Sequence, residues 1–283
     1  MDHDPKGEFS FPPGHYYSPV PSLEEIRMRE KEIFSPLPAE IPGIDLNVED
    51  QLRLLAGFRT YCREFPFGFQ KKEDLRFYLE NPSYGYSDAV ILYCMIRHLK
   101  PKRIIEIGSG FSSCIMLDTN EIFMGNEVSF TFIEPYPQLL MSLVRERDRM
   151  RFQVIPRRLQ EIDTEIFAEL SASDILFIDS THVCKIDSDV NHIFFRVLPH
   201  LKSGVYVHFH DIFYPFEYPK DWVYQGLAWN EAYVLRSFLQ YNQIFRIKFF
   251  NTYMAIFYNK EFVDAMPIPL NHIGGSIWLE KVR

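Results

Sequence analysis

Acidic and imidazole side chains gather in two short segments of this 283-residue chain, each at the end of an apolar run. The first reads Phe177-Ile178-Asp179-Ser180-Thr181-His182, and the second reads Val207-His208-Phe209-His210-Asp211. Such groups can bind a divalent cation that holds and acidifies a hydroxyl, or can supply a general base without a metal. The candidate catalytic residues are therefore His210, His182 and Asp211. The candidate metal ligands are Asp179, His210 and Asp211.

His208 has two interpretations. Side chains alternate along an extended strand, so His208 and His210 share one face and both could serve a site. Alternatively, His208 is a buried histidine of the core, and only His210 and Asp211 reach solvent. The sequence leaves both interpretations open.

A third group of candidate residues is the segment RIIEIGSGFSS at 103–113, where an apolar strand breaks into glycines. Gly108 and Gly110 let the backbone turn sharply and approach a ligand, and the helix expected next directs unpaired N–H groups at it. Ser113 replaces the third glycine of the dinucleotide fingerprint, and Glu106 precedes the first glycine. Because that carboxylate would repel a pyrophosphate but not a cationic ligand, the pattern favours S-adenosylmethionine.

Further cofactor residues are predicted after the second and third strands. Glu134 ends an apolar run where a carboxylate can accept both hydroxyls of an adenosine ribose. Leu159 would pack on the adenine base and Gln160 would bond to it, although a surface loop explains this segment almost equally well. The predicted cofactor-binding residues are Glu106, Gly108, Ser109, Gly110, Ser112, Ser113, Glu134, Leu159, Gln160 and Asp179.

The elements that position these residues alternate between strand and helix, which predicts an α/β fold with a doubly wound parallel sheet. The predicted strands are Arg103–Glu106, Val128–Glu134, Arg151–Ile155, Asp174–Asp179 and Val205–His210. Two further runs, Phe245–Phe250 and Met254–Tyr258, are too close for a helical crossover. They predict a terminal antiparallel hairpin that completes a seven-stranded sheet.

Three regions are predicted along the chain. Residues 1–83 form an N-terminal helical and extended extension that begins with a proline-rich arm, 84–260 form the main domain, and 261–283 form a C-terminal tail. The arm comprises residues 1–43, and its part Phe9–Pro21 and the segment 213–229 are rich in aromatic residues and stiffened by prolines. We expect these two segments to cover an acceptor pocket together.

Bulk properties exclude several classes of partner. A formal net charge of −8 without a dense basic stripe argues against nucleic acid. No apolar run approaches the roughly 20 residues that span a bilayer, and Met1–Pro5 lacks the features of a signal peptide. We therefore expect a cytoplasmic protein that does not bind membranes.

Taken together, these motifs resemble those of class I S-adenosylmethionine-dependent methyltransferases. The chain is most similar to the family-24 methyltransferase domain, which is related to macrocin-type sugar O-methyltransferases, over about residues 84–258. Glu-x-Gly-x-Gly at 106–110 and Phe-Ile-Asp-x-x-His at 177–182 carry the resemblance. It implies a Rossmann-like fold in which 106–110 hold the methionine part of the cofactor and Glu134 holds the ribose.

The resemblance also bears on the metal. Metal-using relatives place acids after the fourth and fifth strands, which correspond to Asp179 and Asp211. This chain has His210-Asp211 where those relatives have Asp-Asp or Asp-Asn. Magnesium or another divalent cation is therefore an optional second cofactor.

We predict an S-adenosylmethionine-dependent O-methyltransferase whose acceptor is a small hydroxylated molecule, such as a saccharide or glycosylated metabolite. One alternative is a catalytically silent binding or scaffold protein that keeps the ligand pocket. Another is a metal-dependent oxygenase on the same fold, with iron held by His182, His208 and His210. A homo-oligomer is compatible with each of them.

Overall fold

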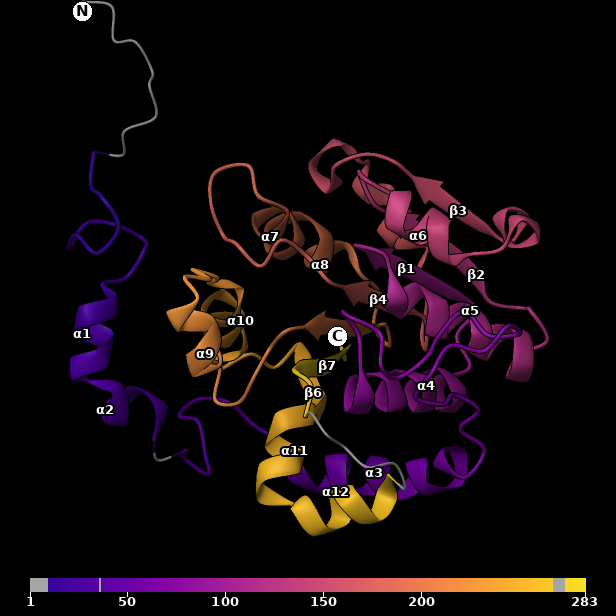
Figure 1. The fold of residues 1–283 in the computed structure, drawn as a ribbon, viewed down its shortest axis with the longest axis horizontal. Coiled ribbons are helices and arrows are strands. Elements are labelled where there is room, and N and C mark those ends of the chain that lie inside the picture. The colour runs from indigo at the N-terminus through magenta and orange to yellow at the C-terminus, as the bar shows by residue number, and fades with distance from the viewer. Residues whose placement is uncertain (1–9, 36, 267–272) are drawn as a thin grey trace, which may run out of the picture.

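A seven-stranded sheet forms the centre of the computed structural model, which describes residues 10–35, 37–266 and 273–283 (Figure 1). The strand order is β3-β2-β1-β4-β5-β7-β6. The parallel strands are β1 (Arg103–Ile107), β2 (Ser129–Ile133), β3 (Phe152–Ile155), β4 (Ile175–Ile178) and β5 (Tyr206–His210). The order reverses between β1 and β4, the point at which open α/β sheets bind ligands.

Helices cover both faces of the sheet, which is why β4 is buried along its whole length and reads as a continuous apolar run. Figure 1 shows α3 (Val48–Cys62) and α4 (Tyr86–Leu99) on one side, and α7 (Asp189–His192) and α8 (Leu198–His200) on the other. The helix α5 (Phe111–Phe123) packs against α4 and α6 (Gln138–Leu143). The predicted α/β class and parallel strands are confirmed.

The terminal strand pair is antiparallel as predicted, but the prediction placed its second strand wrongly. β6 (Phe245–Phe250) is followed by α11 (Asn251–Phe257) and α12 (Asn259–Ala265), so the run at 254–258 is mostly helical. A short apolar run without alternation does not distinguish a buried helix from a strand. The side chain of Asn251 donates hydrogen bonds to Ser87 Oγ and Asp88 Oδ1, which fixes the start of α11.

The partner of β6 is β7 (Ser276–Lys281), which lies in the segment that we expected to be a tail. β7 enters between β5 and β6 and is antiparallel to both. Its central residues Ile277, Trp278 and Leu279 are fully buried, so this strand belongs to the core of the sheet. Parts of the predicted arm and tail, at 1–9, 36 and 267–272, lie outside the described residues.

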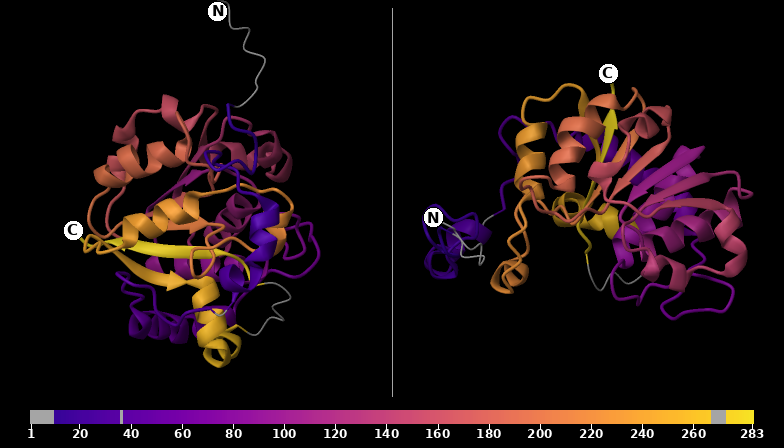
Figure 2. Two further views of the ribbon diagram at one scale, coloured as in Figure 1. Left: turned by 90° about the vertical axis from the view of Figure 1, so that its left-hand side faces the viewer. Right: turned by 90° about the horizontal axis from the view of Figure 1, so that it is seen from above.

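The described part of the arm lies beside the main body. Its helices α1 (Leu23–Met28) and α2 (Glu30–Phe34) contain no buried residue. The arm meets α9 (Lys220–Tyr224), where Glu30 accepts hydrogen bonds from Lys220 Nζ and the Tyr224 hydroxyl, each at 2.7 Å. Figure 2 shows the arm beside α9 and away from the strands. In the described part of the chain, no helix has the length and apolar composition needed to cross a membrane.

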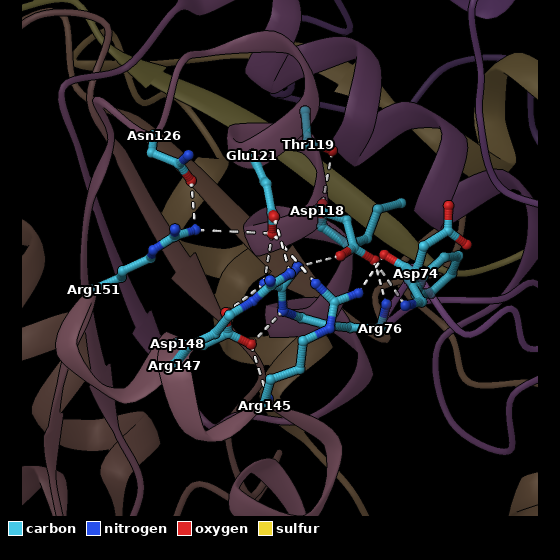
Figure 3. Close-up of polar contacts among 12 residues, drawn as sticks. Asp74, Arg76, Asp118, Thr119, Glu121, Asn126, Arg145, Arg147, Asp148 and Arg151 are labelled. Carbon is cyan, nitrogen blue, oxygen red and sulfur yellow. Dashed lines mark hydrogen bonds and ion pairs between the residues drawn. The ribbon is translucent and has the colours of Figure 1, made fainter.

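One buried cation joins the segment before α4 to the rest of the domain (Figure 3). Arg76 is 3% exposed and forms ion pairs with Asp118 at 2.5 Å, and with Glu121 and Asp148 at 2.6 Å each. Burial alone would lower the pKa of Arg76, but hydrogen bonds to these carboxylates raise it above its ordinary value. Asp118 and Glu121 belong to α5, and Asp148 belongs to the short helix Glu146–Met150. Arg76 therefore stays charged and ties three segments together.

We predict that Arg76→Met lowers the free energy of unfolding by about 3–5 kcal/mol, because it leaves buried carboxylates without a cation. The matched control is Arg151→Met, which removes an arginine that is 41% exposed and 3.9 Å from Glu121. The control should cost less than about 1 kcal/mol. Urea unfolding of both variants at neutral pH measures the difference. Equal losses in the free energy of unfolding for the two variants would show that burial does not determine how much Arg76 contributes to stability.

Candidate functional site

A cavity of about 370 Å³ lies at the carboxyl ends of β1, β2 and β4, beside the reversal of strand order. This is where a doubly wound sheet binds its ligand. Its lining includes five residues that the sequence predicted to contact a cofactor, namely Gly108, Glu134, Leu159, Gln160 and Asp179. We call it the cofactor cavity.

The two glycines of the loop after β1 have different roles. Gly108 has φ +83, and a Cβ atom there would lie 2.2 Å from the carbonyl oxygen of Asp179. Only glycine tolerates both the dihedral angle and that approach. Gly110 has φ 176, which is extended backbone, and a Cβ atom would meet only Leu139 Cδ2 at 3.4 Å. The backbone therefore requires glycine at 108, and the ligand-free backbone does not require it at 110.

Glu106 supports this loop from inside the protein. Its side chain is fully buried, and its two carboxylate oxygens accept hydrogen bonds from the hydroxyls of Ser112 and Ser113, each at 2.5 Å. The Ser113 hydroxyl in turn accepts from the Gly110 N–H at 3.1 Å. Burial raises the pKa of Glu106 to about 8, although the serine hydroxyls act in the opposite direction. These three predicted cofactor residues therefore hold the start of α5 and do not line the cavity.

Glu134 occupies the rim of the cofactor cavity. Its carboxylate accepts from the backbone N–H groups of Ser109 at 3.2 Å and Tyr136 at 2.8 Å, which orient it across the glycine loop. Elsewhere in the lining, Leu159 is buried, and the Gln160 side chain donates to the carbonyl oxygen of Asp187. The residues predicted for the ribose and the adenine therefore line the same cavity.

A second cavity of about 390 Å³ lies on the other side of the strand ends. Its lining includes His210 and Asp211 from the end of β5, together with Asp88. Aromatic rings form its walls, namely Tyr84, Tyr86, Phe213 and Trp222. No lysine or arginine from the described ranges lines it. We call it the acceptor cavity.

The aromatic segment predicted to cover an acceptor contributes to this wall through Phe213, Pro219 and Trp222. No residue from 10–35 lines the cavity, and the arm contacts α9 through Glu30 and Lys220. The remaining wall comes from 81–86 and 273–275, which the sequence analysis did not predict.

Asp179, His182 and Asp211 meet between the two cavities. One candidate ligand atom from each lies within 4.8 Å of the others. His182 Nε2 is 3.4 Å from Asp179 Oδ1 and 3.6 Å from Asp211 Oδ2, while its Nδ1 is 2.9 Å from Glu231 Oε2. Burial alone would lower the pKa of His182, but Asp179 and Glu231 raise it to about 10. Sequence reasoning did not assign a role to Glu231, because nothing local signals a partner 49 positions away.

His210 and His208 occupy different environments. His210 lines the acceptor cavity and its Nε2 lies 3.6 Å from Asp211 Oδ1. Burial alone would lower the pKa of His210, but Asp211 and Asp179 raise it above its ordinary value. His208 is fully buried against Phe177, with ring centroids 4.0 Å apart, and burial lowers its pKa well below the ordinary value. The structure therefore supports the interpretation of His208 as a buried core residue, but neither of its ring nitrogens has a hydrogen-bond partner in the described part of the chain, so it is not the satisfied histidine that this interpretation assumed.

Comparison with known proteins identifies the family of this chain. The methyltransferase-domain family matches residues 105–212. A protein of Archaeoglobus fulgidus, described only as uncharacterized, is 36% identical over 170 residues, which cover 58% of this chain and 76% of that protein. The chain belongs to the class I S-adenosylmethionine-dependent methyltransferases, and its cofactor is S-adenosylmethionine.

Two solved structures are also similar. The methyltransferase PaMTH1 of Podospora anserina, bound to SAH, is 15% identical with a TM-score of 0.45, over 93% of this chain and 98% of that chain. The O-methyltransferase TomG of Streptomyces achromogenes, in complex with SAM, is 13% identical with a TM-score of 0.45, over 92% of this chain and 96% of that chain.

We predict that Gly108→Ala lowers the free energy of unfolding of the ligand-free protein by at least about 2 kcal/mol, because the new Cβ meets the Asp179 carbonyl in a strained conformation. Gly110→Ala is the matched control in the same loop and should change it by less than about 1 kcal/mol. Urea unfolding measures both values. A loss below about 1 kcal/mol in the free energy of unfolding for Gly108→Ala would mean that the backbone at the end of β4 moves to accommodate the new Cβ atom.

We predict that Glu106 makes stability fall as pH rises. Its pKa is about 8 in the folded protein, against an ordinary value of 4.5, so between these values only the folded chain keeps the proton. The free energy of unfolding therefore declines from about pH 5 to pH 8. Glu106→Gln cannot lose a proton and should decline less over that range. Parallel declines in urea titrations at several pH values would contradict a raised pKa for Glu106.

Proposed function

We propose that this methyltransferase transfers its methyl group to a hydroxyl of a small acceptor, with a saccharide or glycosylated metabolite as the class of substrate. The observation that carries this proposal is the meeting of the two cavities. Asp179 lines the cofactor cavity, Asp211 lines the acceptor cavity, and both lie within 4 Å of the same atom, His182 Nε2. Reacting groups bound in the two cavities are thereby brought together.

The cofactor cavity fits S-adenosylmethionine in its chemistry. Glu134 is positioned to accept the ribose hydroxyls, and Leu159 offers an apolar surface for the adenine. Gly108 lines the same cavity without a side chain. When bound, the cofactor supplies an electrophilic methyl group on a sulfonium. Asp179, which lines the same cavity, would supply a carboxylate to offset that positive charge.

His210 is the proposed general base. It faces the acceptor cavity, where its imidazole would take the proton of an acceptor hydroxyl. Asp211, 3.6 Å from His210 Nε2, stabilises the imidazolium that results. His182 lies behind the two carboxylates, and its Nδ1 is engaged by Glu231. A divalent cation held by Asp179 and Asp211 would hold and acidify the same hydroxyl.

The wall of the acceptor cavity favours a neutral polyol. Tyr84, Tyr86 and Trp222 present aromatic surfaces, which pack on the apolar faces of sugar rings. Asp88 and Asp211 supply hydrogen-bond acceptors and negative charge. Without a lysine or arginine from the described ranges to offset it, that charge disfavours phosphorylated or carboxylated acceptors.

Neither alternative is favoured. A silent scaffold would have no need of a base and a carboxylate directed into the acceptor cavity. An oxygenase would need iron held by His182, His208 and His210, and His208 is packed in the core between Phe177 and Trp278.

We predict that two variants separate binding from chemistry. Glu134→Ala should weaken S-adenosylmethionine binding at least about tenfold, since about 1.4 kcal/mol is lost with the ribose contact. His210→Asn should leave that affinity within about threefold and lower kcat by about 10²–10⁴. Calorimetry and transfer of a labelled methyl group to a panel of neutral and phosphorylated saccharides measure both effects.

The matched control is Glu161→Ala, an exposed residue next to Gln160 that should change neither quantity. Wild-type turnover in His210→Asn would remove His210 as the base. Preference for the phosphorylated saccharides would contradict the proposed class of acceptor.

A further inference from the structure

Half-buried aromatic rings form part of the wall of the acceptor cavity. Tyr86, Phe213 and Trp222 all lie in its lining, and each keeps part of its surface exposed. The ring of Trp222 meets that of Phe213 edge to face, with centroids 5.2 Å apart, which orients both rings. No described lysine or arginine lies over either of these two rings. The faces of aromatic rings are negative, so they attract cations as well as the apolar faces of sugars.

Asp88 adds a fixed carboxylate to the same lining. It is 4% exposed, and its Oδ1 accepts hydrogen bonds from the side chains of Asn251 and Ser276, each at 2.6 Å. These two donors hold the carboxylate in place, and a carboxylate with two oxygens keeps further capacity to accept. None of the described lysines or arginines lines the cavity to offset this charge.

The surroundings of the cavity are negatively charged on balance. Burial raises the pKa of the Tyr84 hydroxyl well above its ordinary value, and the charges of Asp88 and Asp179 raise it further. Tyr84 lines the cavity, so the same charges act where an acceptor binds. Even with the imidazoles of His182 and His210 both protonated, the surrounding carboxylates outnumber them, namely Asp88, Asp179, Asp211 and Glu231. A negative potential that keeps a phenol protonated also stabilises an ammonium group.

We propose that the acceptor is a saccharide that carries a protonated amino group, bound by Asp88 and by the ring faces of Phe213 and Trp222. This rests on the proposed function, and it narrows the neutral polyol given there to an amino sugar. A neutral saccharide would use the ring faces but would leave the carboxylate without a cation.

Tyr84 shows that the amine and the reacting hydroxyl fit within one small molecule. Its ring centroid lies 5.0 Å from that of His210, the proposed base. Its hydroxyl donates to the carbonyl oxygen of Asp88 at 3.3 Å. The residue that binds the amine and the residue that takes the proton are therefore separated by a single side chain.

The first experiment measures binding to the full-length protein by calorimetry, with no cofactor present. The probes are D-glucosamine, kanosamine and 6-amino-6-deoxy-D-glucose, which carry an amine at different carbons of one sugar ring. D-Glucose is the neutral match, because it has a hydroxyl in place of each amine. We expect at least one amine to bind at least about tenfold more tightly than glucose. Equal or weaker binding of all three amines overturns the proposal, and so does the absence of binding by all of them.

Variants then locate the amine. Asp88→Asn should abolish the preference for the amine and change the affinity for glucose less than about threefold. Trp222→Leu should lower the preference, and Trp222→Phe should restore most of it because a ring face returns. The matched control Glu80→Gln removes an exposed carboxylate beside the wall, one that pairs with Gln70, and should keep the preference. A wild-type preference in Asp88→Asn overturns the role of Asp88.

Binding without cofactor is measured apart from methyl transfer, so the two proposals fail separately. Circular dichroism establishes that each variant is folded, and the wild-type comparison of the amines with glucose decides the question where a variant is not. A protein that binds and methylates glucose as well as the amines overturns the amine site and leaves the proposed function standing. A protein that prefers the amines but transfers no methyl group overturns the proposed transfer and leaves the amine site standing.

Discussion

The site depends on one close approach between the ends of β1 and β4. The Asp179 N–H donates a hydrogen bond to the Ile107 carbonyl at 2.9 Å. Gly108, which follows Ile107, has no room for a Cβ atom because the Asp179 carbonyl lies too close. This contact directs the Asp179 side chain toward the junction of the two cavities. It also starts the loop that leads into α5, so the cofactor cavity and the cluster of carboxylates and histidine share one backbone constraint.

Two buried side chains stabilise the supports of that constraint. Glu106 holds the first turn of α5 through Ser112 and Ser113, and Arg76 holds the same helix farther along through Asp118. Arg76 also begins the segment that continues to Tyr84 in the acceptor wall. The glycine loop of the cofactor cavity and one wall of the acceptor cavity are therefore anchored on one helix, and both buried side chains are hydrogen-bonded.

The histidines show how position within the fold decides chemistry. His208 and His210 share a face of β5, yet His208 packs between apolar rings while His210 reaches a cavity beside Asp211. His182 lies near the same carboxylates, but Glu231 engages its Nδ1. One imidazole is therefore suited to the core, one to proton transfer and one to orientation by a carboxylate, because their immediate partners differ.

The α/β class, the five parallel strands and the cofactor could be predicted before the structure was known, because periodicity, glycines and strand-end acids are local features of contiguous residues. The sequence also located Glu134 and Asp179 on one rim, since parallel strands end at the same edge of a sheet. It could not place β7 or distinguish α11 from a strand, because the sheet pairing and the Asn251 contacts join residues far apart. The pairing of Glu231 with His182, and the finding that the backbone requires glycine at 108 but not at 110, came from the folded structure. Hydrogen-bond partners and steric room at these positions are supplied by distant parts of the chain.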